Sequence, residues 1–240
     1  TVKDAKFIGI GNYQRIFTDS TFTNSFKFTV LFAVASIVLI NVIAFILALL
    51  LTRKLKGTNI FRTILFMPNL IGGIVLGYIW QLLINGVLAH FNVTITADPK
   101  YGFWGMVILT NWQLIGYMMI IYIAGIQNIP TELIEAAEID GANKFQTLYK
   151  IIIPMTMPSV TICLFLTLTN CFKLFDQNLA LTAGGPAKKT AMLAYDIYTT
   201  FYNRNGWEGV GQAKAVIFFI IVAAISLTQL YFTRRKEVEN

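Results

Sequence analysis

Five segments of this chain are long and apolar enough to cross a lipid bilayer, and they restrict the fold more than any other feature. They cover residues 26–51, 62–84, 103–126, 158–181 and 213–233. A helix needs about 20 mostly apolar residues to cross the hydrocarbon core, where each backbone amide must find its hydrogen-bond partner within the segment. The sequence therefore predicts an all-α membrane protein with five spans.

The composition agrees with this prediction. Hydrophobic residues make up 56% of the chain and charged residues 13%, whereas soluble domains carry about 25% charged residues. The net charge of +7 includes bases that flank the apolar segments at 53–62 and 234–236, a position typical of the water interface of a span. Because no aromatic-basic motif accompanies them, the charge does not indicate a nucleic-acid partner.

Single residues inside the first two segments suggest how the helices pack. Pro68 and the pair Gly72-Gly73 predict a kink or a close helix approach in the second segment. Asn41 in the first segment either lines a polar path or bonds to a neighbouring helix. The sequence alone favours neither role for Asn41.

A polar, acidic stretch of residues 130–154 separates the third and fourth segments. Its first part has helical character, with Thr131 as the expected N-cap and glutamates near the positive helix start. Gly141 is expected to end this helix, and a second amphipathic segment, residues 143–153, is expected to stop near Pro154. Two short helices around a glycine bend form a surface hairpin, which suggests docking to a soluble partner.

The fourth segment is the most polar of the five. It contains Asn170, Lys173 and Asp176, and ionisable residues inside a span indicate a functional path because they are costly to place there. Lys173 and Asp176 lie three residues apart and can share one helical face, so an ion pair that only stabilises packing is the alternative. The single histidine, His90, lies outside the predicted spans, which argues against a histidine-based intramembrane enzyme.

The acidic stretch carries a motif at fixed spacing. Glu135-Ala136-Ala137 is followed by three residues, Gly141, nine residues and then an Ile-x-x-Pro string that ends at Pro154. This pattern resembles the EAA loop of ABC-importer permeases, with Ile153 where that family prefers leucine.

Further strings extend the resemblance over about residues 7–236. They are Phe61-Arg62-Thr63, Phe66-Met67-Pro68, Ile129-Pro130, Ile139-Asp140-Gly141-Ala142 and Leu181-Thr182 with Gly184-Gly185-Pro186. In these strings the chain is similar to the carbohydrate-uptake branch, in particular to the first membrane subunit of maltose systems.

The resemblance implies a type I ABC-importer transmembrane fold in a bacterial inner (cytoplasmic) membrane, crossed several times. That fold usually has six spans with both ends inside, which implies one further span upstream of residue 1. The lysines and arginines do not decide the orientation, because they divide equally between the two sides; the resemblance places the hairpin in the cytoplasm. It thereby implies an extracytoplasmic lead-in (1–25), a transmembrane domain (26–233) with the coupling hairpin at 130–154 and a basic cytoplasmic tail (234–240). The residue pattern of Ala191–Tyr202 is amphipathic, so we expect this segment to lie at the membrane interface.

The resemblance also implies partners. They are a second homologous permease, two ATP-binding subunits, an extracytoplasmic sugar-binding protein, membrane lipid and the sugar itself. The sequence has no phosphate loop of the G-x-x-x-x-G-K-[ST] type, so we expect this chain to be no enzyme and to bind no cofactor. ATP and Mg would bind to the partner ATPase.

Two groups of site residues follow. The expected ATPase-coupling residues are Glu135, Ala136, Ala137, Asp140, Gly141 and Pro154. By resemblance, sugar contacts fall at Gln113, Leu114, Tyr117, Asn170, Cys171 and Leu174, beside the polar pair Lys173 and Asp176. Cys171 stands where the family has a polar amide and Leu114 where it has a glycine, which puts the identity and pose of the sugar in doubt.

The charges of the fourth segment bear on the cargo. A phosphate such as glycerol phosphate favours several bases and a polyamine several carboxylates, but only Lys173 and Asp176 are available. This count favours a neutral polyol, with another polar solute of the same transporter class, or a membrane channel, as the alternatives. A channel would not need the acidic hairpin.

Overall fold

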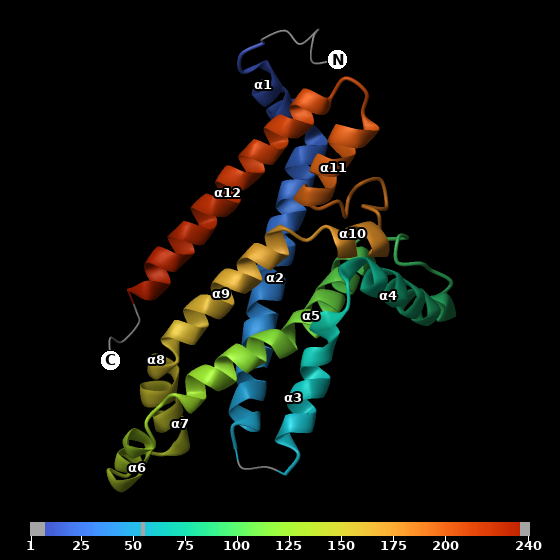
Figure 1. The fold of residues 1–240 in the computed structure, drawn as a ribbon. Coiled ribbons are helices and arrows are strands. Elements are labelled where there is room, and N and C mark those ends of the chain that lie inside the picture. The colour runs from blue at the N-terminus through green and yellow to red at the C-terminus, as the bar shows by residue number, and fades with distance from the viewer. Residues whose placement is uncertain (1–7, 54–55, 236–240) are drawn as a thin grey trace.

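A computed structural model describes residues 8–53 and 56–235, and these fold into helices without strands (Figure 1). The first half comprises α1 (Gly11–Thr18), α2 (Ser20–Leu51), α3 (Thr58–Phe66), a 3-10 turn (Met67–Leu70), α4 (Gly73–Leu88), a 3-10 turn (Ala89–Phe91) and α5 (Pro99–Gln127). The second half comprises α6 (Thr131–Ile139), α7 (Lys144–Thr147), a π-helical turn (Leu148–Ile152), α8 (Ile153–Met155), α9 (Met157–Phe172), α10 (Asp176–Leu181), α11 (Leu193–Asn203) and α12 (Glu208–Arg234).

Four of the described helices are long and apolar enough to cross a membrane. They are α2, α4 with its following 3-10 turn, α5 and α12. A fifth span results if the helices Lys144–Met155 and Met157–Phe172, which meet at an angle of 67°, are taken together. The predicted all-α membrane fold is confirmed, and three of the five predicted spans are single continuous helices.

The second predicted span, residues 62–84, is wrong as one continuous helix. The chain forms α3, turns through Met67–Leu70, becomes extended at Ile71 and Gly72, and restarts as α4. Pro68 lies at the first turn of the 3-10 segment, where its missing amide hydrogen costs no helical bond. The result is a sharp change of direction between α3 and α4 (Figure 1).

The fourth predicted span, residues 158–181, is also interrupted. Helix α9 ends at Phe172, and α10 begins at Asp176 after three non-helical residues. No proline or glycine lies at residues 173–175, so no local sequence signal marks this break. Cys163 and Cys171 both lie in α9 and are free, buried thiols.

The lead-in is shorter than predicted and partly helical. Helix α2 begins at Ser20 rather than near residue 26, with the Asp19 side chain accepting a hydrogen bond from the Thr21 amide as its N-cap. The rest of the described lead-in contains α1. Residues 1–7, Lys54 and most of the predicted basic tail, 236–240, lie outside the described residues.

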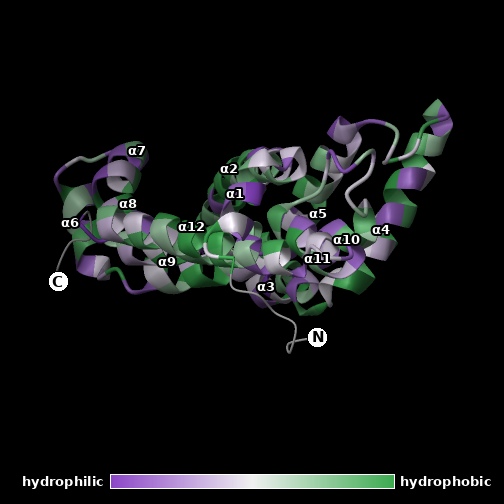
Figure 2. Ribbon diagram, turned by 90° about the horizontal axis from the view of Figure 1, so that it is seen from above, coloured by the Kyte–Doolittle hydropathy of each residue, from purple (hydrophilic) through white to green (hydrophobic). Residues whose placement is uncertain are grey.

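The core forms where α2 packs against α5 and α9. Large side chains such as Phe32, Ile40, Met118 and Tyr122 are almost fully buried there. The hairpin α6–α8 projects on one side of the molecule and α4 on the other, as both views show (Figures 1 and 2). The turn between α2 and α3 lies at the hairpin end, and α1 and α11 lie at the other (Figure 1).

Asn41 bonds to neighbouring helices. Its amide nitrogen donates to Thr167 Oγ1 of α9 at 3.0 Å, and its amide oxygen accepts from the Tyr122 hydroxyl of α5 at 2.7 Å. Asn41 therefore ties α2, α5 and α9 together within the core.

Helix α11 corresponds to the amphipathic segment predicted for the membrane interface. One face of it is buried, through Leu193, Asp196 and Thr200. Lys214 of α12 is fully buried, and its ammonium group donates to Asp196 at 2.6 Å, to Asp19 at 2.8 Å and to Thr200 at 2.9 Å. The helix is thus fastened to α12 and to the start of α2 by a buried charge cluster.

Candidate functional site

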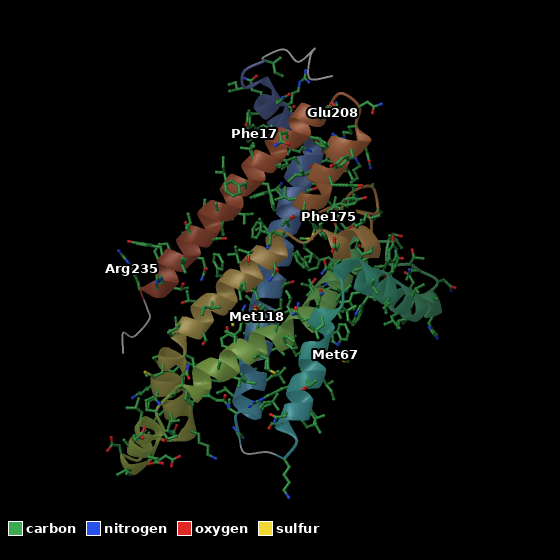
Figure 3. The ribbon with its side chains drawn as sticks, viewed as in Figure 1. Phe17, Met67, Met118, Phe175, Glu208 and Arg235 are labelled. Atoms are coloured by element: carbon green, nitrogen blue, oxygen red, sulfur yellow. The ribbon has the colours of Figure 1, made fainter. Side chains whose placement is uncertain are left out.

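A polar cavity of about 410 Å³ lies between the two helix breaks and α5. Met67 and Phe175 mark the two breaks in Figure 3. The lining comprises Asn69, Thr110, Gln113, Leu114, Asn170, Lys173, Leu174, Phe175, Asp176 and Gln177. The breaks therefore bring polar side chains from distant parts of the chain into one hollow among apolar helices.

Side-chain amides join the walls of this cavity. Gln177 Nε2 of α10 donates to Gln113 Oε1 of α5 at 2.8 Å, and Gln113 Nε2 donates to the Ile71 carbonyl at 3.2 Å. The second bond satisfies a backbone oxygen freed by the break between α3 and α4, as burial requires. Gln113 thus acts as a bridge between the two discontinuities.

Two glycines let α4 lie directly against α10. A β-carbon at Gly73 would stand 2.8 Å from the Asp176 β-carbon, and one at Gly77 would stand 2.5 Å from the Ala180 β-carbon. Atoms of real side chains do not approach so closely, so both positions need glycine for this contact. The close approach expected from the Gly72-Gly73 pair occurs at Gly73.

Six of the eight substrate-path candidates line the cavity. They are Gln113, Leu114, Asn170, Lys173, Leu174 and Asp176. Cys171 lies elsewhere, fully buried in the core, and Tyr117 packs its ring against Phe66 at 6.3 Å between centroids.

The structure adds lining residues that sequence reasoning did not select. Asn69, Thr110 and Phe175 belong to this group. Asn69 follows Pro68 directly, so the helix-breaking signal could have pointed to it. Thr110 and Phe175 carry no comparable local signal.

The ion pair between Lys173 and Asp176, which the sequence left open as the alternative to a functional path, does not form. Among the described residues, the ion pairs within 4.0 Å involve Arg204, Lys214, Asp19 and Asp196 only. Lys173 follows the last residue of α9 and Asp176 opens α10, so the two do not share the single helical face that pairing required. Both charges instead face the cavity as separate groups.

A second candidate site is the hairpin around Gly141. Gly141 has φ +79°, and its amide donates to the Glu138 carbonyl at 3.1 Å. The Ala142 amide donates to the Ala137 carbonyl at 2.9 Å, which completes a Schellman motif that ends α6. The predicted glycine stop occurs as expected. The predicted N-cap is wrong, because Thr131 is already helical and Pro130 is the N-cap, without a side-chain cap bond.

The return arm of the hairpin has its own capping. Asn143 and Gln146 form a capping box, with bonds of 2.8 and 2.9 Å, which satisfies two free amides at the start of α7. A π-helical turn follows before Pro154, and the helical path continues to Met155 before it bends at Thr156. Pro154 therefore lies one residue inside the return helix rather than at its end.

The tip of the hairpin is exposed. Glu135, Ala136, Asp140 and Gly141 face solvent, whereas the Ala137 side chain is 9% exposed and faces inward. Large apolar side chains are also exposed on the hairpin, most of all Ile139 at 87%, Phe145 at 73% and Tyr149 at 67%. Charged and apolar groups side by side on a rigid projection are typical of a protein contact surface.

The hairpin is connected to the cavity through α5 and α9. A β-carbon at Gly125 would stand 2.1 Å from Ser159 Oγ. The C-terminal end of α5 therefore contacts the N-terminal end of α9 beside the hairpin. Farther along, Asn41 links Tyr122 of α5 with Thr167 of α9. Both helices then continue to the cavity, where they supply Gln113 and Asn170.

These features define a helical membrane protein with a polar cavity at its helix breaks and an exposed hairpin joined to it through α5 and α9, an arrangement that suits a membrane transporter. The chain belongs to the family described as "binding-protein-dependent transport system inner membrane component", whose profile matches residues 56–238. The family match includes both the cavity and the hairpin.

Curated relatives extend over nearly the whole chain. A probable starch degradation products transport system permease protein, AmyD, from Thermoanaerobacterium thermosulfurigenes is 48% identical over 97% of this chain and 82% of its own length. The multiple sugar-binding transport system permease protein MsmF from Streptococcus mutans is 31% identical over 97% of this chain and 83% of its own length.

A solved structure has the same fold. It is a bacterial ABC transporter involved in the import of the acidic polysaccharide alginate, with a TM-score of 0.83. It is 19% identical, and the match covers 97% of this chain and 85% of that chain. The ABC-importer transmembrane fold implied by the sequence motifs is confirmed.

Proposed function

We propose that this chain is the permease subunit of an ATP-driven importer of neutral oligosaccharides in a bacterial inner membrane. Its cavity would hold the sugar, and its hairpin would bind an ATP-hydrolysing partner. The observation that carries the proposal is the rigid hairpin whose two flanking helices, α5 and α9, reach the polar cavity.

The cavity lining supports an uncharged, polar cargo. Asn69, Asn170 and the Gln113–Gln177 pair offer amide donors and acceptors, while Lys173 and Asp176 contribute one charge of each sign. A phosphate or a polyamine would need an excess of one sign, whereas sugar hydroxyls bond to amides and to either charge. The names of the two relatives above refer to starch degradation products and to multiple sugars; both support a sugar cargo, and the first supports glucose oligosaccharides.

The hairpin would transmit motion from ATPase to cavity. Closure of two ATP-binding subunits would displace the exposed tip around Glu135 and Asp140, and α5 and α9 would follow as one body because Asn41 holds them together. We assign the coupling contacts to Glu135, Ala136, Asp140 and Gly141. Ala137 would keep the tip close to the return helix of the hairpin, since its side chain points inward. Pro154 would act by shaping that return helix.

The remaining partners complete the proposed assembly. A second, homologous permease would close the cavity on its open side, and an extracytoplasmic binding protein would deliver the sugar at the α1–α11 end. A solved ABC importer is described in complex with a pentasaccharide-bound periplasmic protein, which supports delivery of this kind in the fold.

The coupling role can be tested with two glycines of equal backbone strain. Gly141 (φ +79°) and Gly57 (φ +85°) both have open space where an added β-carbon would stand, with nothing within 4 Å, so alanine costs about 1 kcal/mol at either site. We expect Gly141→Ala and Glu135→Lys to lower sugar uptake about tenfold relative to ATP hydrolysis in proteoliposomes, a change of about 1.4 kcal/mol in coupling.

The Gly57→Ala control should retain the wild-type ratio of uptake to hydrolysis, since Gly57 lies in the turn between α2 and α3. Full coupled uptake by both hairpin variants would disprove the coupling assignment. Co-purification of an ATP-binding subunit should weaken in the same variants.

A further inference from the structure

Helix α11 presents an aromatic stripe on the face opposite its buried one. Ala194, Ile197, Tyr198, Phe201 and Tyr202 follow the spacing of three, four, seven and eight residues that places side chains on one helical face. Together with Gly211, Gln212 and Ala215 of α12 they line a groove of about 420 Å³. Tyr198 and Tyr202 are 40% and 68% exposed.

The groove adjoins the polar cavity. Phe175 lines both hollows. Its ring centroid lies 5.2 Å from that of Tyr198, which lies 5.0 Å from that of Tyr202. The three rings thus form a ladder that starts at Phe175 and follows α11, and α11 runs toward the end of the molecule that carries α1 (Figure 1).

The buried charge cluster fixes the direction in which this ladder faces. Asp196 and Thr200 are both bonded to Lys214, and they occupy the opposite side of α11 from Tyr198 and Tyr202. Gly211 allows α12 to approach closely, because a β-carbon there would stand 2.9 Å from the Phe201 β-carbon. The helix therefore cannot rotate its rings away without breaking the cluster.

The groove has the chemistry of a carbohydrate surface. A pyranose ring has an apolar face of C–H groups that packs on aromatic rings, while its edge carries hydroxyls. Tyr198 and Tyr202 keep 40% and 68% of their surface exposed, so part of each ring remains available to a ligand. The Gln212 amide and the tyrosine hydroxyls supply the few polar groups that orient a ligand in such a site.

We propose that this groove is a second carbohydrate subsite, which holds the trailing units of an oligosaccharide whose leading end occupies the polar cavity. The proposal rests on the proposed function, since it needs a sugar as cargo. It predicts that the ladder matters for long chains and not for a disaccharide, which fits within the cavity alone.

The test uses the complete transporter with its partner subunits in proteoliposomes, supplied with maltose or maltoheptaose. Tyr198→Leu and Tyr202→Leu remove the aromatic faces and keep apolar volume. We expect the KM for maltoheptaose uptake to rise about tenfold, equivalent to about 1.4 kcal/mol, with the KM for maltose unchanged. Tyr231→Leu, at an exposed tyrosine near the other end of α12, is the matched control and should change neither.

A second measurement does not depend on transport. In a Tyr202→Cys transporter, a membrane-impermeant maleimide should label residue 202 of this chain, because the native Cys163 and Cys171 are buried. Maltoheptaose should slow this labelling, since it would cover the groove, and maltose should not.

Three outcomes would overturn the proposal in distinguishable ways. Import of both sugars with an unchanged KM in the tyrosine variants would rule out the proposed subsite and leave the proposed function intact. A wild-type complex that imports neither sugar would rule out both the subsite and the proposed function. Loss of the second permease from the purified variants would assign the groove to a subunit interface instead.

Discussion

Lys214 shows how much a single buried residue can organise. Its ammonium group is surrounded by Asp19, Asp196 and Thr200, and Arg204 adds a second base to Asp19 at 3.1 Å. Burial alone would raise the pKa of Asp19, but hydrogen bonds from Lys214 and Thr21 outweigh it and lower the pKa to about 2. Asp19 is therefore charged at neutral pH. The contact of α11 with α12 and the N-cap of α2 thus both depend on the Lys214 ammonium group.

Removing this cation should destabilise the fold strongly. Lys214→Met leaves two carboxylates buried without their main partner, which costs about 3–5 kcal/mol when one member of a buried ion pair is lost. We expect a clear drop in the midpoint of thermal unfolding of the purified complex. Lys27→Met, at an exposed lysine of α2, serves as the control and should leave the midpoint nearly unchanged. Equal midpoints for both variants would show that the cluster is energetically neutral.

The sequence could have pointed to Lys214 but not to its partners. Residue 214 lies inside the predicted fifth span, where an ionisable group is a functional signal. Asp19 is 195 residues away along the chain and Asp196 is 18 residues away, so no helical spacing connects the three. By contrast, the Gly141 bend was predictable because a Schellman motif is encoded within a few consecutive residues.

At the scale of the elements, the two helix breaks differ in how they are encoded. Pro68 and Gly72 mark the break between α3 and α4 in the sequence itself. The break between α9 and α10 falls on Lys173-Leu174-Phe175, a string with ordinary helix propensity. It arises from packing, because α10 must turn to reach Gly73 and Gly77 of α4, and such long-range contacts leave no local pattern.

Close packing of α3 on α5 gives a sharp prediction. A β-carbon at Gly116 would stand 1.9 Å from the Leu65 carbonyl oxygen, and backbone cannot move aside as a side chain can. Gly116→Ala should therefore destabilise the protein by about 1–3 kcal/mol or more, as overpacking does. The readout is the midpoint of thermal unfolding.

The control is Gly86→Ala in α4, where nothing lies within 4 Å of the new methyl group. Alanine is favoured over glycine in a helix by up to about 1 kcal/mol, so this variant should be neutral or slightly stabilised. Similar losses at both positions would contradict the close contact of α3 and α5.

Across the whole molecule, the spans differ in how far the chain itself covers their apolar residues. Only 6% of the most apolar window of α12 and 11% of that of α4 are buried within the molecule. Helix α5 is different, with 67% of its window buried, because it crosses the centre of the core. The protein must therefore complete its burial with lipid and with partner helices.

The two ends of the molecule should face opposite sides of the membrane. Ile139 lies at the hairpin end and Asn205 follows α11 at the other end, and both are exposed. In intact cells we expect Asn205→Cys to react with a membrane-impermeant maleimide and Ile139→Cys to react only after permeabilisation. The reverse pattern would invert the proposed orientation and rule out the proposed contact between the hairpin and an ATPase.

The polar cavity also sets how tightly any cargo can be held. Amides, hydroxyls and the separate charges of Lys173 and Asp176 wall it, and such groups are too costly to leave dry. The hydroxyls of a bound solute thus replace water at these polar groups, and the hydrogen bonds gained and lost are of nearly equal enthalpy. The binding affinity of the cavity for its cargo is therefore modest. A weakly bound solute can dissociate on the opposite side of the membrane without further energy input.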